Sequence, residues 1–261
     1  MSARELSINI EYAFTEAGDD LADRIRAAAA AGFTKVEIFT TDGRDVPALA
    51  AAAEEAGVQV WTMVSDPRIA LFDKANHDGF IEKFTALADD AVAIGCPYIV
   101  VPSGIAVPYL KRPVQLDAVV EAVTRAAAVA EAKGIAILLE AVNTRMDHPG
   151  VLFARTEDSA YVARAVNSPR VRVLYDLYHS MVEGEQPETV LPVVADLVGH
   201  IQIADAPGRG EPGAGEVDWT WALDLIDSVG CGGVLGIECY PTRPAAEALT
   251  SFTELVARRA G

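Results

Sequence analysis

Short apolar runs alternate with amphipathic segments along the whole chain. Five stretches run from an alanine-rich or amphipathic part through a glycine into a β-type run: "AAAAAGFTKVEIF", "AEEAGVQVWTMV", "AVAIGCPYIVV", "AEAKGIAILLE" and "IDSVGCGGVLGIE". Each glycine is typical of a helix C-cap, because glycine adopts a left-handed backbone without steric cost. These glycines are Gly32, Gly57, Gly95, Gly134 and Gly230. The short apolar run after each one predicts a buried strand.

Extended over the whole chain, this pattern predicts eight strands and eight helices. The strands are expected at about 6–13, 35–40, 58–64, 98–103, 135–141, 171–177, 200–204 and 233–239. The helices are expected near 18–31, 46–56, 76–94, 114–133, 156–167, 186–197, 219–229 and 244–259. Strict alternation with strands rich in Val, Ile and Leu is typical of a parallel sheet.

Eight strand–helix units in 261 residues fit a closed (β/α)8 TIM barrel. An open, doubly wound sheet would share the alternation, but no G-x-G-x-x-G follows the first predicted strand. No linker or break in composition divides the chain. We therefore predict a single TIM-barrel domain over residues 1–261, with its active site at the C-terminal ends of the strands.

Composition and charge narrow the class of partner. The formal net charge of −17 argues against nucleic acid, whose phosphates require clustered Lys and Arg. No stretch approaches the roughly 20 apolar residues of a membrane span. The start, "MSARELSINIEY", lacks the apolar block of a signal peptide, and three cysteines without a C-x-x-C pair suit a reducing compartment. We expect a cytoplasmic protein that acts on a small molecule.

Four predicted strands in the second half end in an oxygen-bearing side chain. "ILLE" ends at Glu140, "VLYD" at Asp176, "HIQ" at Gln202 and "LGIE" at Glu238. Because the intervals between them each match one strand–helix unit, all four are expected to meet at the mouth of the barrel. Any one of them alone could be a capping or salt-bridged residue, which is the commoner role for a single acidic side chain.

Three carboxylates and an amide at a half-buried mouth repel one another unless a cation lies between them. A divalent metal ion would remove this repulsion. Because all four expected ligand atoms are oxygens, the set favours Mg2+ or Mn2+ over Zn2+. The sequence therefore predicts a metal site of Glu140, Asp176, Gln202 and Glu238.

Further polar residues surround these positions. His179 follows Asp176 by three residues, which predicts a place on the rim. Arg209 lies in the glycine-rich loop "ADAPGRGEPGAGE", which is either a plain surface turn or a loop that brings backbone close to a ligand. Arg145 comes shortly after Glu140. A lone histidine such as His200, below Gln202, is more often a hydrogen-bonded core residue than a metal ligand.

Four motifs resemble a known family. "LLEAVNTRMDHPG", "YDLYHSMVEGE", "GHIQIADAPGRGEPGAGEVDW" and "GVLGIECYP" are similar to hydroxypyruvate isomerases, within the xylose-isomerase-like (AP endonuclease family 2) barrel superfamily. The resemblance is strong over residues 135–241. The segments "MVSDPRIALFDKANHDGF" and "VPSGIAVPYLKRP", after the third and fourth predicted strands, depart from the isomerase pattern.

The resemblance implies roles for individual residues. It assigns the metal to Glu140, Asp176, Gln202 and Glu238, and makes Glu140 and Glu238 the acid/base pair. It implies that His179 and Arg209 bind substrate oxygens. Glu37 occupies a place compatible with a glutamate that the family carries in its second strand. Dimers or tetramers are usual for the family, so the resemblance also implies a homo-oligomer.

The leading hypothesis is a metal-dependent isomerase that interconverts hydroxypyruvate and tartronate semialdehyde, with Arg209 and Arg145 binding the substrate carboxylate. Two facing glutamates and a divalent ion would equally suit a ketose 3-epimerase or a cyclitol or 2-oxo-tetronate isomerase. An endonuclease IV-like nuclease would need a histidine-rich zinc cluster and a basic surface, and the chain has four histidines. A barrel that binds sugar acids without catalysis is the remaining alternative.

Overall fold

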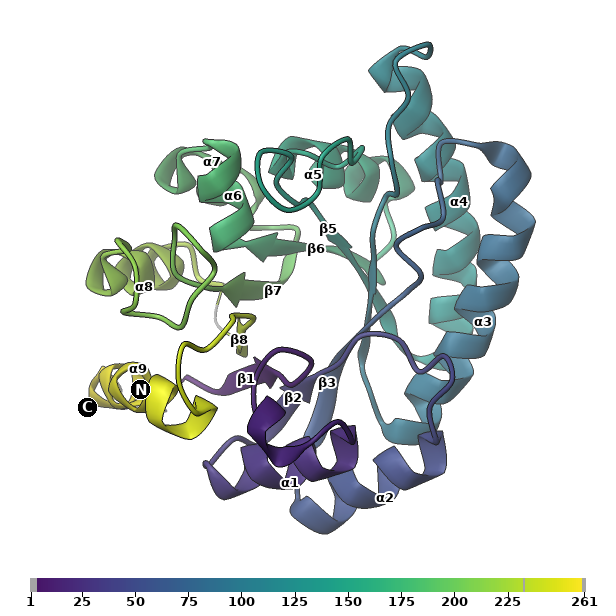
Figure 1. Ribbon diagram of the computed structural model, residues 1–261. Coiled ribbons are helices and arrows are strands. Elements are labelled where there is room, and N and C mark those ends of the chain that lie inside the picture. Colours follow the sequence, from purple (N-terminus) through teal and green to yellow (C-terminus); the bar gives the residue numbers. More distant parts are fainter. Residues whose placement is uncertain (1–3, 232, 260–261) are drawn as a thin grey trace.

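Eight parallel strands close into a barrel in the computed structural model, which describes residues 4–231 and 233–259 (Figure 1). Each strand pairs with the next along the chain, and the last pairs with the first. The closed barrel confirms the predicted fold. The strands are β1 (Leu6–Asn9), β2 (Lys35–Glu37), β3 (Gln59–Val64), β4 (Tyr98–Val101), β5 (Ala136–Glu140), β6 (Val171–Asp176), β7 (Val198–Ile203) and β8 (Leu235–Ile237).

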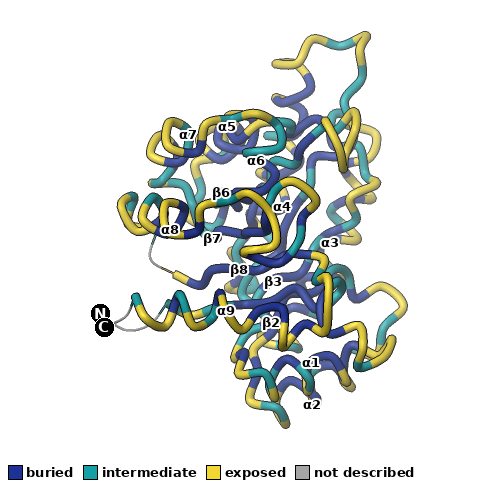
Figure 2. Tube along the Cα trace, turned by 60° about the vertical axis from the view of Figure 1, so that its left-hand side comes forward, coloured by how far each residue is buried: buried dark blue, intermediate teal, exposed yellow. Residues whose placement is uncertain are grey.

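Helices surround the barrel, and α3 and α4 are the longest of them. The helices are α1 (Leu21–Ala30), α2 (Val46–Ala56), α3 (His77–Ile94), α4 (Arg112–Lys133), α5 (Thr156–Val166), α6 (Leu177–Glu183), α7 (Pro187–Val194), α8 (Trp219–Ser228) and α9 (Ala245–Arg258). None of those in the described ranges is both long and apolar enough to cross a membrane. Figure 2 shows that the helices expose their outer faces while the strands between them are buried.

The sequence pattern missed α6 and two short 3-10 helices, η1 (Thr15–Ala17) and η2 (Lys74–Asn76). Helix α6 begins directly after β6, where the side chain of Asp176 accepts the backbone N–H of His179 at 2.9 Å and caps the helix. The prediction that the first strand continues to residue 13 was wrong. The strand ends at Asn9, whose side chain accepts the N–H of Glu11 and turns the chain.

The predicted helix C-caps are correct at three glycines, Gly57, Gly95 and Gly134, which all adopt the left-handed conformation. At α1 and α8 the cap residues are instead Ala31 and Val229. Gly32 and Gly230 lie one residue further on and also have positive φ angles. The glycines therefore mark the helix ends to within one residue.

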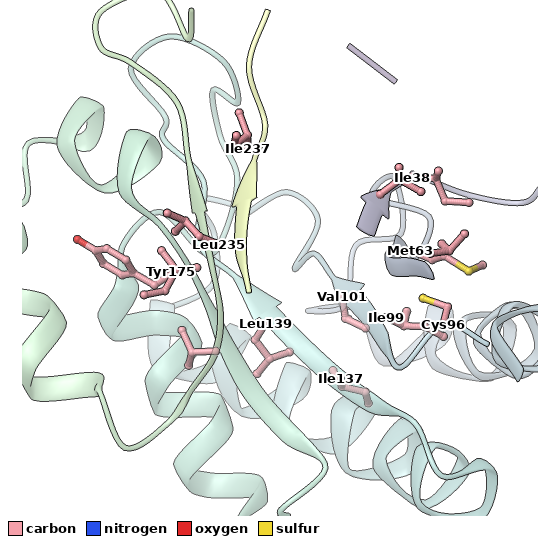
Figure 3. Packing of buried hydrophobic residues seen from close by; sticks show 14 of the residues in the cluster. Ile38, Met63, Cys96, Ile99, Val101, Ile137, Leu139, Tyr175, Leu235 and Ile237 are labelled. Atoms are coloured by element: carbon pink, nitrogen blue, oxygen red, sulfur yellow. The ribbon is translucent and has the colours of Figure 1, made fainter. Parts of the chain in front are cut away.

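Side chains along each strand alternate between the helix-facing layer and the barrel interior. Figure 3 shows the outer layer, with Ile99 and Val101 from β4 and Ile137 and Leu139 from β5 in one buried cluster. The residues of opposite parity form a second, smaller cluster of Val100, Leu138 and Leu174 inside the barrel. Glu140 and Asp176 lie two residues after Leu138 and Leu174, so their side chains also point into the barrel, at the C-terminal ends of β5 and β6.

Candidate metal and substrate site

The barrel brings the four predicted strand-end residues to one end. Glu140 and Asp176 are the last residues of β5 and β6, and Gln202 lies near the end of β7. The β6–β7 register pairs Asp176 with Gln202, and the β7–β8 register pairs Gln202 with Gly236. Glu238 follows two residues later, just beyond β8. The carboxyl ends of four neighbouring strands therefore surround one buried polar region.

Glu140, Asp176 and His179 form the tightest group of this region. One potential ligand atom from each lies within 4.8 Å of the others. His179 Nε2 lies 3.9 Å from Glu140 Oε1 and 4.0 Å from Asp176 Oδ2. The histidine is 2 % exposed, so its predicted position on the rim was wrong. The first turn of α6 folds it inward, because that helix begins immediately at the strand end.

The hydrogen bonds of His179 identify it as a donor toward the site. Its Nδ1 accepts the backbone N–H of Asn143 at 3.2 Å and the Asn143 side-chain amide at 2.7 Å. Burial, with a further contribution from Arg209, holds the pKa of His179 well below its usual value, so the ring is neutral. A neutral ring that accepts at Nδ1 carries its proton on Nε2. His179 thus presents an N–H, rather than a lone pair, to Glu140 and Asp176.

Glu238 is held from three directions. Its Oε1 accepts from Arg209 Nη2 at 2.5 Å. Its Oε2 accepts from Asn9 Nδ2 at 3.2 Å and from Gln202 Nε2 at 2.8 Å. The sequence pattern did not reveal Asn9, although "SINI" alternates polar and apolar residues and so indicates that one face of this strand is polar.

The carboxyl groups of the site share raised pKa values. Burial is the main cause for each of them. Mutual repulsion adds to it, because Glu238 and Asp176 further raise the pKa of Glu140. For Glu238, burial together with Asp176 and Glu37 outweighs the lowering effect of Arg209 and raises the pKa to about 7. The site therefore concentrates more negative charge than its own residues neutralise.

Two buried oxygen atoms in this region have no hydrogen-bond partner among the described residues. They are Oδ2 of Asp176 and Oε1 of Gln202, which belong to residues paired across β6 and β7. A buried acceptor without a partner is costly unless a cation or a donor satisfies it. Together with the carboxylate of Glu140, which lies in the same group as Asp176, these oxygens fit a hard divalent cation. Glu238 lies outside that group, and its oxygens accept from Arg209, Asn9 and Gln202. This fit rests on the donor set and on the two unpaired oxygens.

Arg209 is the cation that the protein itself supplies. Its Nη2 contacts Glu238 and lies 3.8 Å from Asp176 Oδ2. The guanidinium lies over the rings of Tyr12 and Tyr178, at 5.7 and 5.4 Å from the ring centroids. Its Nε is buried and has no partner among the described residues. Arg209 therefore keeps a free donor beside the carboxylates.

The loop that carries Arg209 is held in place by two buried carboxylates, so it is not a plain surface turn. Asp205 accepts from the N–H of Gly213 at 2.7 Å and from Trp219 Nε1 at 2.8 Å. Glu211 accepts from both the N–H and the hydroxyl of Thr242. These bonds tie the loop to α8 and to the segment after β8, which orients the arginine toward the mouth.

Arg145 lies elsewhere. Its guanidinium lies against Gly184, and the side chain lines a cavity of about 590 Å³ together with Arg155 and Glu183. This cavity contains none of the four strand-end residues. Arg145 therefore does not lie where it could bind the carboxylate of a substrate at the predicted site. Arg209 does, because it contacts the carboxylates of that site.

Glu37 lies inside the barrel as a fully hydrogen-bonded residue. Burial by itself would raise its pKa, but His200, Ser7 and Gln202 together hold the pKa below the usual value. His200 Nε2 lies 2.8 Å from Glu37 Oε1, so this histidine supports the site through Glu37. The sequence placed both residues on suitable strands but contained no signal that they meet.

Comparison with known proteins agrees with this geometry. The family model described as "Xylose isomerase-like TIM barrel" matches residues 25–255. This chain belongs to the xylose isomerase-like TIM barrel family. The family membership confirms the resemblance drawn from the four sequence motifs.

Individual relatives span nearly the whole chain. A protein of Streptomyces coelicolor named "Putative hydroxypyruvate isomerase" is 31 % identical, covering 91 % of this chain and 91 % of the relative. A human protein of the same name is 28 % identical and covers 96 % and 94 %. A crystal structure of "AP endonuclease, family 2" from Brucella melitensis superposes with a TM-score of 0.89 at 25 % identity, covering 96 % and 98 %.

Proposed function

We propose that this protein is a metal-dependent isomerase of a small hydroxy-oxo acid, and that hydroxypyruvate, converted to tartronate semialdehyde, is its substrate. The names of its relatives support this substrate class. The observation that carries the proposal is the pair of glutamates, partly buried Glu140 and buried Glu238, with raised pKa values beside two unpaired acceptor oxygens.

The proposed cation is Mg2+ or Mn2+, held by oxygens of Glu140, Asp176, Gln202 and Glu238. Both ions accept a cage of oxygen ligands. A bound divalent ion would act as a Lewis acid on the substrate carbonyl and hydroxyl oxygens. His179 is not included among the ligands, because its proton lies on the nitrogen that faces the site.

The two glutamates account for the proton transfers. One carboxylate removes a proton from the hydroxymethyl carbon of hydroxypyruvate, and a proton is then delivered to the neighbouring carbonyl carbon. The substrate hydroxyl proton moves to the other oxygen, so the product is an isomer and nothing is consumed. Burial raises the pKa of Glu238 in the protein without a cation, which favours proton uptake by this carboxylate.

Arg209 and His179 would bind the substrate. The free Nε of Arg209 can donate to the substrate carboxylate, and a planar guanidinium suits a planar carboxylate. His179 Nε2–H can donate to a substrate oxygen. Both side chains are almost completely buried, which strengthens these interactions by excluding water.

The test is turnover of hydroxypyruvate by metal-stripped protein to which Mg2+ or Mn2+ is returned. We expect metal-dependent formation of tartronate semialdehyde. Arg209→Lys keeps the charge but loses the planar fork, so it should raise KM for the acid; Arg145→Lys serves as the matched control and should leave KM unchanged.

The same protein should be incubated in deuterated solvent with a panel of 2-oxo-tetronate and neutral ketoses. Incorporation of deuterium into a ketose, without turnover of hydroxypyruvate, would mean that a ketose is the substrate. The proposed metal site would stand. Absence of both turnover and exchange under every metal would overturn the isomerase proposal.

A further inference from the structure

A buried polar network surrounds Glu37 inside the barrel. Its Oε1 accepts from Ser7 Oγ at 2.5 Å and is bonded to His200 Nε2 at 2.8 Å. Its Oε2 accepts from Thr62 Oγ1 at 3.1 Å and from Gln202 Nε2 at 2.6 Å. All five residues are at most 3 % exposed. The carboxylate is therefore saturated with partners and has no capacity left for a ligand of its own.

The network determines which way the amide of Gln202 points. The amide nitrogen lies 2.6 Å from Glu37 Oε2 and 2.8 Å from Glu238 Oε2. The oxygens of Glu37 also accept from the hydroxyl groups of Ser7 and Thr62, so Glu37 acts as an acceptor and the NH2 end of Gln202 must face it. The carbonyl oxygen of Gln202 is then left buried, with no hydrogen-bond partner among the described residues.

We infer that Glu37 is a positioning residue that directs the carbonyl oxygen of Gln202 toward the cation, an inference that rests on the proposed metal site. Glu238 cannot do this alone, because it is itself a proposed ligand and its oxygens are shared with the cation and Arg209. Glu37 has no such second task. Without it, the Gln202 amide can rotate and present its NH2 group to the cation, which repels a positive charge.

A general principle and one observation distinguish the positioning role of Glu37 from ordinary packing. A buried charge with its partners is seldom a gain in stability over apolar residues of similar volume. The neighbouring part of the barrel interior is in fact apolar, with Val100, Leu138 and Leu174. Polar residues are thus not required to fill the interior of this barrel. The network also ends in a specific contact, the hydrogen bond from the Gln202 amide to Glu37.

Gly236 provides independent support. A Cβ at this position would overlap Glu37 Oε1, and would lie 2.7 Å from His200 Nε2 and 3.1 Å from Gln202 Cγ. Gly236 is also the register partner of Gln202. A side chain at this point of β8 would displace the carboxylate from the amide that it orients, so the glycine preserves the space the network needs.

The experiment is a double-mutant cycle read by calorimetric titration of the metal-stripped, full-length protein with Mn2+. Glu37→Met has similar length but no acceptor, and should weaken Mn2+ binding about 10- to 100-fold, the usual effect of removing an outer partner of a ligand. Ser7→Ala removes a different bond to Glu37 and leaves its contact with Gln202, so its affinity should remain within about threefold of wild type, well below that range.

The second arm of the cycle uses Gln202→Glu, whose carboxylate presents an oxygen in either rotation. In that background Glu37→Met should have little effect or even improve binding, because it also removes a neighbouring like charge. An equal loss in both backgrounds would show general distortion and overturn the inference. Should Glu37→Met fail to fold, Glu37→Asp takes its place, since it keeps the charge but withdraws the acceptor from Gln202.

The failures of the two proposals are distinguishable. A wild-type protein that binds no Mn2+ would refute the metal site itself. A wild type that binds Mn2+, with Glu37→Met binding equally well, would refute only the positioning role. Glu37→Gln adds a graded check, because its single carbonyl oxygen can still face Gln202 and should restore most of the affinity lost in Glu37→Met.

Discussion

The barrel interior has two contrasting sides. On β4, β5 and β6, the inward residues Val100, Leu138 and Leu174 pack as a small apolar cluster. On β1, β2, β3 and β7, the inward residues are polar and hydrogen-bond to one another: Ser7, Glu37, Thr62, His200 and Gln202. Both sides are equally buried.

The difference shows what each side contributes. Burying the apolar side chains removes hydrocarbon from water and favours folding. Burying Glu37 requires the loss of its hydration, which its four hydrogen bonds offset but do not clearly exceed. The polar side therefore contributes orientation where the apolar side contributes stability, and four measurements can test this division.

The largest effect on turnover is expected for substitution of Glu238, at the mouth of the barrel. Glu238→Gln removes a proton acceptor and a proposed metal ligand, so turnover of the substrate should fall about 10²- to 10⁴-fold. Steady-state kinetics measure this. Leu138→Met is the matched control, since a swap of similar volume on the apolar side should leave turnover nearly unchanged. Comparable losses in both variants would mean that the two sides are not functionally distinct.

On the apolar side, Leu138→Ala should lower the free energy of unfolding by about 2–5 kcal/mol, because it removes buried methyl groups and leaves a cavity. Urea denaturation measures this loss. Mn2+ affinity, measured on the folded variant by titration, should stay close to that of wild type. A marked loss of metal affinity would show that the apolar cluster also positions the ligands.

Metal loading should act through the polar side alone. Mn2+ at about 100 times its dissociation constant should stabilise the folded protein by about 2.7 kcal/mol, since the ligand set is assembled only in that state. Chemical denaturation with and without a chelator measures the increment. Leu138→Ala should show the same increment as wild type, whereas Asp176→Asn should lose most of it.

The smallest effect is a dependence on pH in metal-free buffer. The pKa of Glu238 rises from the ordinary value near 4.5 in the unfolded chain to about 7 in the folded protein. Between these values the folded state holds a proton that the unfolded state has released. The stability contributed by this group is therefore present at low pH and is lost as pH rises through 7.

Between pH 5 and pH 8, the free energy of unfolding of the wild type should consequently fall by about 1–3 kcal/mol relative to that of Glu238→Gln. The difference between the two unfolding free energies at each pH is the quantity to follow. His179, whose shift has the opposite sign, is present in both proteins and largely cancels. A difference that stays constant with pH would indicate that Glu238 is already ionised at pH 5.

Much of the fold and part of the candidate site could be predicted from local patterns. The apolar runs and the glycines after the helices located the strands, and the carboxylate that closes an apolar run placed Glu140 and Asp176 at strand ends. The inward turn of His179 could not be predicted, because it depends on α6 starting at the residue that also caps it. Asn9 and Tyr12 were missed because they belong to the first strand–helix unit, outside the recognised motifs, and come next to Glu238 only when β1 pairs with β8.

Local backbone geometry is encoded along the chain, so the order of strands and helices and the residues that share a strand face could be predicted without a structure. Closure of the barrel decided which of those residues meet. Glu37 and Gln202 are 165 positions apart, yet their side chains are joined by a hydrogen bond of 2.6 Å. No local pattern encodes such a contact, because it depends on β8 closing against β1 and on a glycine at the position where Glu37, His200 and Gln202 need the room.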